Sequence, residues 1–168
     1  MKEILLAGAL ALMYSLFGTP LLIKILARRG YGQMIRDDGP ESHQVKRGTP
    51  TMGGIIFITG AAFAYFIAHA ISGNAVSTSA LLVLGLTFSL GFVGFLDDYM
   101  KISRQNSAGI NGKQKIFGQV LFAAIFAYAG LHFADKDGLT PLSLNISVLR
   151  DTSISLAPII AIIWIVLM

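Results

Sequence analysis

The sequence has no cysteine among its 168 residues and few charged side chains, which make up 13% of the chain. Without cysteine, disulfide scaffolds, thiolate zinc sites and cysteine nucleophiles are excluded. A soluble domain usually carries about 25% charged residues, so the shortage argues against a soluble globular domain, a disordered chain and a nucleic-acid-binding protein. What is abundant is apolar: 54% of the residues are hydrophobic, and the mean hydropathy is +0.68. The composition predicts an integral membrane protein.

Four apolar stretches are each long enough for a helix that crosses the hydrocarbon core, which takes about 20 residues. They cover approximately Ile4–Ile23, Met52–Ile71, Thr78–Leu96 and Ile116–Phe133. A fifth apolar run begins near Leu156 and reaches Met168, which is too short for a comfortable span. We therefore predict a single all-α, polytopic transmembrane domain over residues 1–168, with four complete transmembrane helices and a truncated fifth.

The placement of positive charge predicts the orientation of these helices. The net charge is +4, and ten of the 13 lysines and arginines lie in two segments, Lys24–Pro50 and Asp97–Lys115. Cytoplasmic loops of membrane proteins carry such an excess. We therefore expect both segments to lie in the cytoplasm and the N-terminus to lie outside, and we do not expect nucleic acid as a partner.

The long connection before the fifth apolar run has a different pattern. Within it, apolar and polar residues alternate with the period of two that is typical of a half-buried strand. The apolar members are Leu142, Leu144, Ile146 and Val148. This pattern predicts a small β-hairpin on the outer face.

The first candidate for chemistry is the pair Asp97 and Asp98, at the inner end of the third predicted span. Ionisable groups at membrane depth are costly and suggest function. An ordinary span boundary, with Lys101 pairing with Asp97 one helical turn away, is the simpler interpretation. Adjacent carboxylates repel each other unless a cation relieves them, and a pair of oxygen ligands beside a basic loop suits Mg²⁺ with a phosphorylated substrate.

The second candidate is the run Lys46-Arg-Gly-Thr-Pro-Thr-Met-Gly-Gly54. It offers a phosphate-seeking lysine, the hydroxyls of Thr49 and Thr51, and glycines that allow close approach of the backbone. The alternative is a helix start in which Thr49 or Thr51 is the N-cap and the glycines serve helix packing. Composition alone favours that alternative.

The third candidate is a group of basic residues in the loop after the aspartates: Lys101, Arg104, Lys113 and Lys115. Such residues usually only set topology and attract anionic lipid. Their placement on the same predicted side of the membrane as the other two candidates favours a functional role for these residues as well. Acidic metal ligands and several cations at one interface suit phosphoryl transfer to an acceptor held in the membrane.

Three motifs together resemble a known family: Arg36-Asp-Asp-Gly-Pro-Glu-Ser-His43, the run Lys46 to Gly54, and Gly94-Phe-Leu-Asp-Asp-Tyr-Met-Lys101. They are similar to those of bacterial phospho-N-acetylmuramoyl-pentapeptide transferases, in the polyprenyl-phosphate N-acetylhexosamine-1-phosphate transferase superfamily. Gly109-Ile110, followed by Lys113 and Lys115, also resembles the loop of that family.

The resemblance implies a Mg²⁺-dependent enzyme of cell-wall peptidoglycan synthesis. Undecaprenyl phosphate would attack the β-phosphate of UDP-N-acetylmuramoyl-pentapeptide at the inner face of the cytoplasmic membrane and release UMP. Asp97 and Asp98 would be the catalytic carboxylates and tentative metal ligands. The phosphate path would be lined by Lys46, Thr51, Lys101, Lys113 and Lys115. Family members are ten-span homodimers and targets of nucleoside antibiotics such as tunicamycin.

The resemblance covers about half of the family's length. The later Asn-Leu-Thr-Asp-Gly-Leu-Asp-Gly segment, which supplies the main metal-binding aspartate, is not in this sequence, so we expect the 168-residue piece alone to be inactive. Three alternatives stay open. They are a related enzyme that transfers N-acetylglucosamine-1-phosphate, a transporter, and a non-catalytic membrane scaffold.

Overall fold

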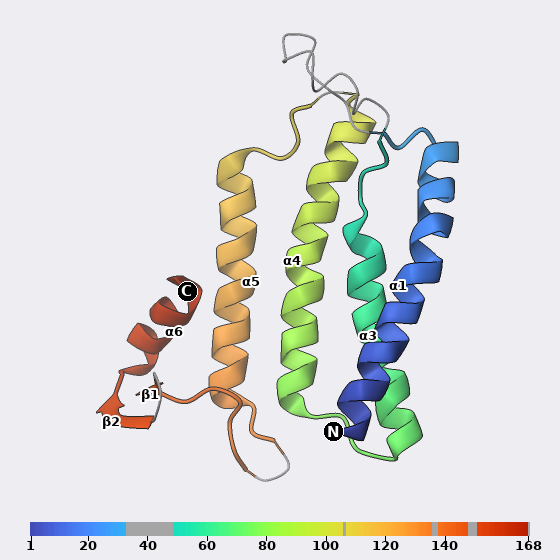
Figure 1. Cartoon of the computed structure of the whole chain (residues 1–168). Coiled ribbons are helices and arrows are strands. Elements are labelled where there is room, and N and C mark those ends of the chain that lie inside the picture. The colour runs from blue at the N-terminus through green and yellow to red at the C-terminus, as the bar shows by residue number, and fades with distance from the viewer. Residues whose placement is uncertain (33–48, 106, 136–137, 148–150, 168) are drawn as a thin grey trace. The chain divides into compact units, whose positions relative to one another are not determined.

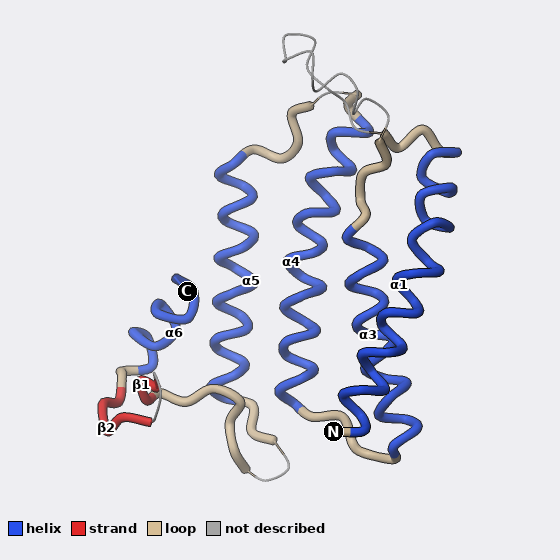
Figure 2. The backbone as a smooth tube through the Cα atoms, viewed as in Figure 1, coloured by secondary structure: helices blue, strands red, loops and turns tan. Residues whose placement is uncertain are grey.

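The computed structural model describes residues 1–32, 49–105, 107–135, 138–147 and 151–167. Helices dominate this part of the chain (Figures 1 and 2). The helices and strands are α1 (Lys2–Arg28), α3 (Gly54–Ser72), α4 (Thr78–Ser103), α5 (Gly112–His132), β1 (Asn145–Ser147), β2 (Asp151–Ser155) and α6 (Pro158–Leu167).

The four predicted spans correspond to α1, α3, α4 and α5, each long and apolar enough to cross a membrane. Three of them are longer than the apolar stretches that predicted them. The helix α4 continues past Leu96 to Ser103 and thus carries both aspartates on its last turns. The helix α6 has ten residues, which gives about 15 Å of length against a hydrocarbon core of about 30 Å.

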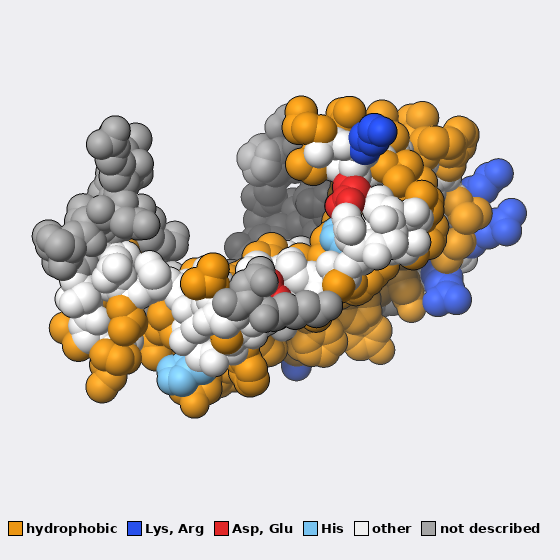
Figure 3. Space-filling view, turned by 90° about the horizontal axis from the view of Figure 1, so that it is seen from below, with side chains coloured by type: hydrophobic (Ala, Val, Ile, Leu, Met, Phe, Trp, Pro, Cys, Tyr) orange, Lys and Arg blue, Asp and Glu red, His pale blue; other side chains and the backbone are white. Residues whose placement is uncertain are grey.

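Large apolar side chains lie mostly on the surface of these helices, as Leu12 (68% exposed), Phe17 (69%) and Phe117 (68%) illustrate. Figure 3 shows hydrophobic side chains over much of the face that it presents. A soluble monomer rarely exposes apolar patches of this extent. A chain whose solvent is lipid exposes them by default, which agrees with a multi-pass membrane protein.

The chain divides into two compact units. The first contains residues 1–75 and 91–115, and therefore α1, α3 and the second half of α4. Within it, α1 and α3 pack along each other (Figure 1). A Cβ atom on Gly60 would lie 2.8 Å from the ring of Tyr14, so a small residue lets the two helices approach closely.

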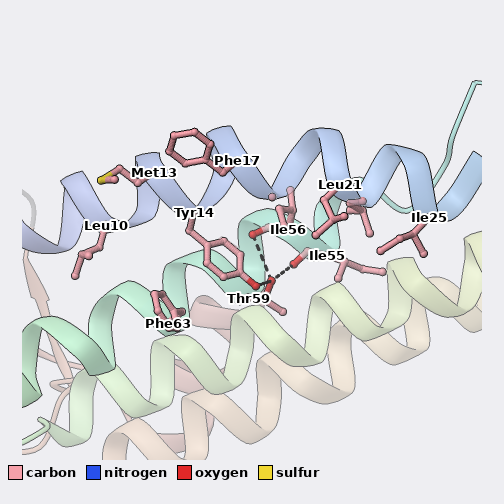
Figure 4. Close-up of a pocket in the computed structure, with 12 residues that line it drawn as sticks. Leu10, Met13, Tyr14, Phe17, Leu21, Ile25, Ile55, Ile56, Thr59 and Phe63 are labelled. Carbon is pink, nitrogen blue, oxygen red and sulfur yellow. Dashed lines mark hydrogen bonds between the residues drawn. The ribbon is translucent and has the colours of Figure 1, made fainter.

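Beside this contact, α1 and α3 form an apolar cavity of about 640 Å³ (Figure 4). Its polar groups are satisfied within the protein: the Tyr14 hydroxyl donates to Thr59 Oγ1 (3.3 Å), and the Thr59 hydroxyl donates to the carbonyl of Ile55 (2.7 Å). The cavity lining therefore presents an almost purely hydrophobic surface.

The second unit contains residues 76–90 and 116–168, of which 116–132 belong to α5. Its strands β1 and β2 pair in antiparallel fashion, with Asn145 opposite Ser155. Residues 148–150, which join the strands, lie outside the described residues, as does Val148 of the predicted alternation. Leu142 and Leu144 precede β1 rather than lying in it. The predicted hairpin and its place on an outer face therefore stay predictions.

Candidate active site

Asp97 is the central residue of the candidate site. It is 7% exposed and is the one charged side chain in the buried class among the described residues. A buried carboxylate without partners would destabilise the protein by several kcal/mol. The sequence supplies partners from three places: the same helix, the loop that leads into α5, and the first turn of α5.

Three donors hold the Asp97 carboxylate. Oδ2 accepts from Lys101 Nζ at 2.7 Å, one turn further along α4, and it pairs with Lys115 Nζ at 3.0 Å, from the first turn of α5. Oδ1 accepts from the backbone N–H of Ile110 at 2.9 Å. The predicted pairing of Lys101 with Asp97 is confirmed, and both oxygens of Asp97 are engaged.

Asp98 has a different environment. Its side chain is 32% exposed, and its contacts are longer: Lys101 Nζ lies 3.4 Å from Oδ1, and the N–H of Met52 lies 3.3 Å from Oδ2. The two aspartates face a cavity of about 300 Å³ whose other lining residues are Met52, Gly54, Ile55, Ile58, Gly91, Gly94 and Phe95. The oxygens of Asp98 can therefore accept further hydrogen bonds or bind a cation, because each has only one long contact.

The turn before α3 lies against Asp98 through Met52. Met52 is buried, and its backbone adopts the left-handed conformation (φ 69°), which non-glycine residues adopt at a cost. The neighbouring Thr51 donates its N–H to the carbonyl of Tyr31 (3.3 Å), and its buried hydroxyl has no hydrogen-bond partner among the described residues. Within the described chain it is therefore a buried polar group whose hydrogen-bonding capacity is unused.

The alternative interpretation of this turn is right that a helix starts here and wrong about the residue that caps it. The N-cap of α3 is Gly53, and no side chain caps the helix, so neither Thr49 nor Thr51 has that role. A Cβ atom on Gly53 or Gly54 would meet nothing within 4 Å, so these glycines do not serve helix packing within the described chain.

The two lysines at the start of α5 separate in space. Lys115 reaches Asp97, whereas Lys113 is exposed and forms no ion pair with a described residue. Residues two apart on a helix point in different directions, which explains why only one of them joins the cluster. Lys46 lies outside the described residues.

Residues 46–58 match the phospho-N-acetylmuramoyl-pentapeptide-transferase signature 1. The phospho-N-acetylmuramoyl-pentapeptide-transferase of Kineococcus radiotolerans is 56% identical over 159 residues, which cover 94% of this chain and 44% of the relative. Those of Streptomyces avermitilis (51% identity, 98% and 46% covered) and Cutibacterium acnes (49% identity, 100% and 48% covered) are similar throughout. This chain belongs to the phospho-N-acetylmuramoyl-pentapeptide-transferase family. It spans about half the length of these relatives.

Sequence reasoning about this family member missed three site residues that act through the backbone. The N–H groups of Met52 and Ile110 each bind one aspartate, and Gly109 lies against Asp97. Backbone contacts leave no signature in side-chain chemistry. The one available signal was the position of Gly109-Ile110 in a polar loop between two apolar helices.

The described part of this transferase-family chain contains no group of three or more histidines, aspartates or glutamates that would hold a metal ion. Both oxygens of Asp97 already accept from cations or an amide, so a metal ion would have to compete with them. Asp98 fits as a single carboxylate ligand. Mg²⁺ is commonly bound by one or two carboxylates together with water and substrate phosphates.

Proposed function

We propose that the complete protein transfers phospho-N-acetylmuramoyl-pentapeptide from its UDP-linked precursor to undecaprenyl phosphate. A phosphate oxygen of the lipid forms a bond to the β-phosphorus of the nucleotide, the bond from that phosphorus to the bridging oxygen breaks, and UMP leaves with the electron pair. The product is the first lipid-linked intermediate of peptidoglycan. Membership of the family supports this reaction, since the relatives carry the name of the activity.

The observation that carries the proposal is that two adjacent carboxylates line one cavity, of which Asp97 is buried and fully engaged and Asp98 is partly exposed. Asp97 fixes the ammonium groups of Lys101 and Lys115 within 3.0 Å of one oxygen. Fixed cations stabilise charge that develops on transferring phosphoryl oxygens, and they need no reorganisation during the reaction. Phosphoryl transfer depends almost entirely on such positioning and electrostatics.

We assign the two aspartates different roles on this basis. Asp97 positions Lys101 and Lys115, whereas Asp98 faces the reacting groups. We assign Thr51 the role of a donor to a phosphate oxygen, because its hydroxyl has no partner among the described residues and it precedes the amide that binds Asp98. Exposed Lys113 and the more N-terminal Lys46 complete the proposed phosphate path.

Mg²⁺ belongs to the proposal as a cofactor. When bound, it would neutralise diphosphate charge and stabilise UMP as a leaving group. Asp98 is the residue of this chain that fits it, with Asp97 as a tentative second ligand and the main ligand expected from the rest of the protein. The residues of this chain would otherwise bind and orient the phosphates.

The proposal also covers location and partners. The basic segments support a site at the inner face of the bacterial cytoplasmic membrane, where a lipid phosphate would be held by its tail and a soluble nucleotide would arrive from the cytoplasm. The family relationship supports a ten-span homodimer surrounded by membrane lipid. It also supports inhibition by nucleoside antibiotics such as tunicamycin.

The proposed reaction is tested by the release of UMP from purified complete protein in detergent with undecaprenyl phosphate. We expect turnover with UDP-N-acetylmuramoyl-pentapeptide and Mg²⁺, and its loss on chelation by EDTA with recovery on adding Mg²⁺. UDP-N-acetylglucosamine should give no turnover, and neither should the 168-residue piece alone. Turnover with the acetylglucosamine nucleotide would instead favour the related enzyme class, and turnover by the piece alone would contradict our assignment of the main metal ligand.

The proposed orientation is tested by labelling single cysteines introduced into the complete protein, with any cysteines outside these cysteine-free 168 residues replaced first. Exposed Ala75 precedes α4, and exposed Ser103 ends it. The helix between them is about 39 Å long at 1.5 Å per residue. In intact cells, an impermeant maleimide should label Ala75→Cys and should reach Ser103→Cys only after the membrane is opened. The reverse pattern, or labelling of both from outside, would contradict a cytoplasmic site.

A further inference from the structure

The loop between α4 and α5 contains a glycine that touches the central carboxylate. A Cβ atom on Gly109 would overlap Asp97 Oδ1, and it would lie 2.8 Å from Asp97 Cγ and 2.9 Å from Lys101 Cε. The next residue, Ile110, donates its N–H to the same Oδ1 at 2.9 Å. The backbone at Gly109 and Ile110 therefore covers the Asp97–Lys101 pair at van der Waals distance.

The need for glycine at position 109 is steric rather than conformational. Among the described glycines, left-handed φ values occur at Gly30, Gly73 and Gly138, so the backbone angles of Gly109 suit an alanine. The space does not. The two nearest atoms that a methyl group would meet belong to a carboxylate held by three donors, which has little freedom to move aside.

We infer that Gly109 is a positioning residue for the proposed reaction: its missing side chain lets the Ile110 amide reach Asp97 and keeps the carboxylate aligned with Lys101 and Lys115. This inference rests on the proposed function. The same oxygen that a methyl group would displace faces Ile110, and the other oxygen carries both lysines. Displacement of Asp97 therefore moves both cations together.

Gly109→Ala in the complete protein is expected to lower kcat/KM for UMP release by about 10²-fold, because a shift of about 1 Å in a catalytic arrangement has an effect of that size. Gly112→Ala is the matched control, since a Cβ there meets nothing within 4 Å, and it should stay within about twofold of the wild type. In an Asp97→Asn background, Gly109→Ala should cause no further loss, because both changes act through one carboxylate.

A thermal-unfolding cycle distinguishes this inference from the proposed function. Gly109→Ala should lower the Tm in the wild-type background and have little effect in the Asp97→Ala background, where the methyl group has room. Equal kcat/KM values for Gly109→Ala and Gly112→Ala, or an equal loss of Tm in both backgrounds, would overturn the inference. If the wild type itself releases no UMP, the proposed function fails, and the Tm cycle alone decides whether Gly109 positions Asp97.

Discussion

Asp98→Asn in the complete protein is expected to lower the rate of UMP release by about 10³-fold, which corresponds to about 4 kcal/mol of activation free energy. Asparagine has nearly the shape of aspartate, and its amide oxygen still accepts from the Met52 amide 3.3 Å away. What the variant loses is the negative charge that faces the cavity beside α4. Steady-state UMP release with saturating Mg²⁺ measures this loss.

The Tm of Asp98→Asn should be close to that of the wild type, because the side chain is 32% exposed and its contact with Lys101 is long (3.4 Å). Glu3→Gln, which removes a carboxylate at the start of α1, serves as the control for a general effect of charge and should keep full activity. Full activity of Asp98→Asn would remove this carboxylate from the mechanism and with it our assignment of roles.

Asp97→Asn is expected to affect stability as well as activity. The change removes the negative charge shared by Lys101 and Lys115, whose ammonium groups lie 2.7 and 3.0 Å from one oxygen. Without it, two close cations repel each other. Because the lysine side chains are 35% and 40% exposed, we expect a loss of about 1 to 2 kcal/mol, between the values for surface and buried ion pairs.

UMP release by Asp97→Asn should fall by about 10²-fold or more, since the lysines no longer have fixed positions. Thermal unfolding in detergent and UMP release measure the two effects. Lys113→Gln is the control for stability, because exposed Lys113 forms no ion pair with a described residue, and its Tm should not change. An Asp97→Asn protein with wild-type Tm would show that the ion-pair cluster does not stabilise the fold.

The sequence predicted the helices well because long apolar stretches have few alternatives in a membrane. It placed the end of α4 too early, since hydropathy falls at Asp97 whereas the helix continues to Ser103. Hydropathy reports the preference of side chains for lipid, and backbone hydrogen bonds do not stop where that preference does. The two aspartates lie near the end of α4 as predicted, and Lys101, which was expected in the following loop, is helical as well.

The site was predicted as a set of residue types, and the structure separates their environments. Adjacent Asp97 and Asp98 are equivalent in sequence, yet successive helical residues point about 100° apart, so Asp97 is buried among cations and Asp98 is about one-third exposed. Which residue takes which place depends on the loops before α3 and α5. Those contacts are long-range, and neither spacing nor composition encodes them.

The order in which Asp97 meets its partners has a consequence for biosynthesis. Lys101 follows it by four residues on α4, so the ion pair forms as soon as that helix does, whereas Ile110 and Lys115 emerge from the ribosome later. Asp97 is thus paired with a cation as soon as α4 forms, and such pairing lowers the cost of an acidic side chain near the membrane. The remaining contacts of Asp97, with Ile110 and Lys115, form only later, when the loop after α4 and the first turn of α5 fold against it.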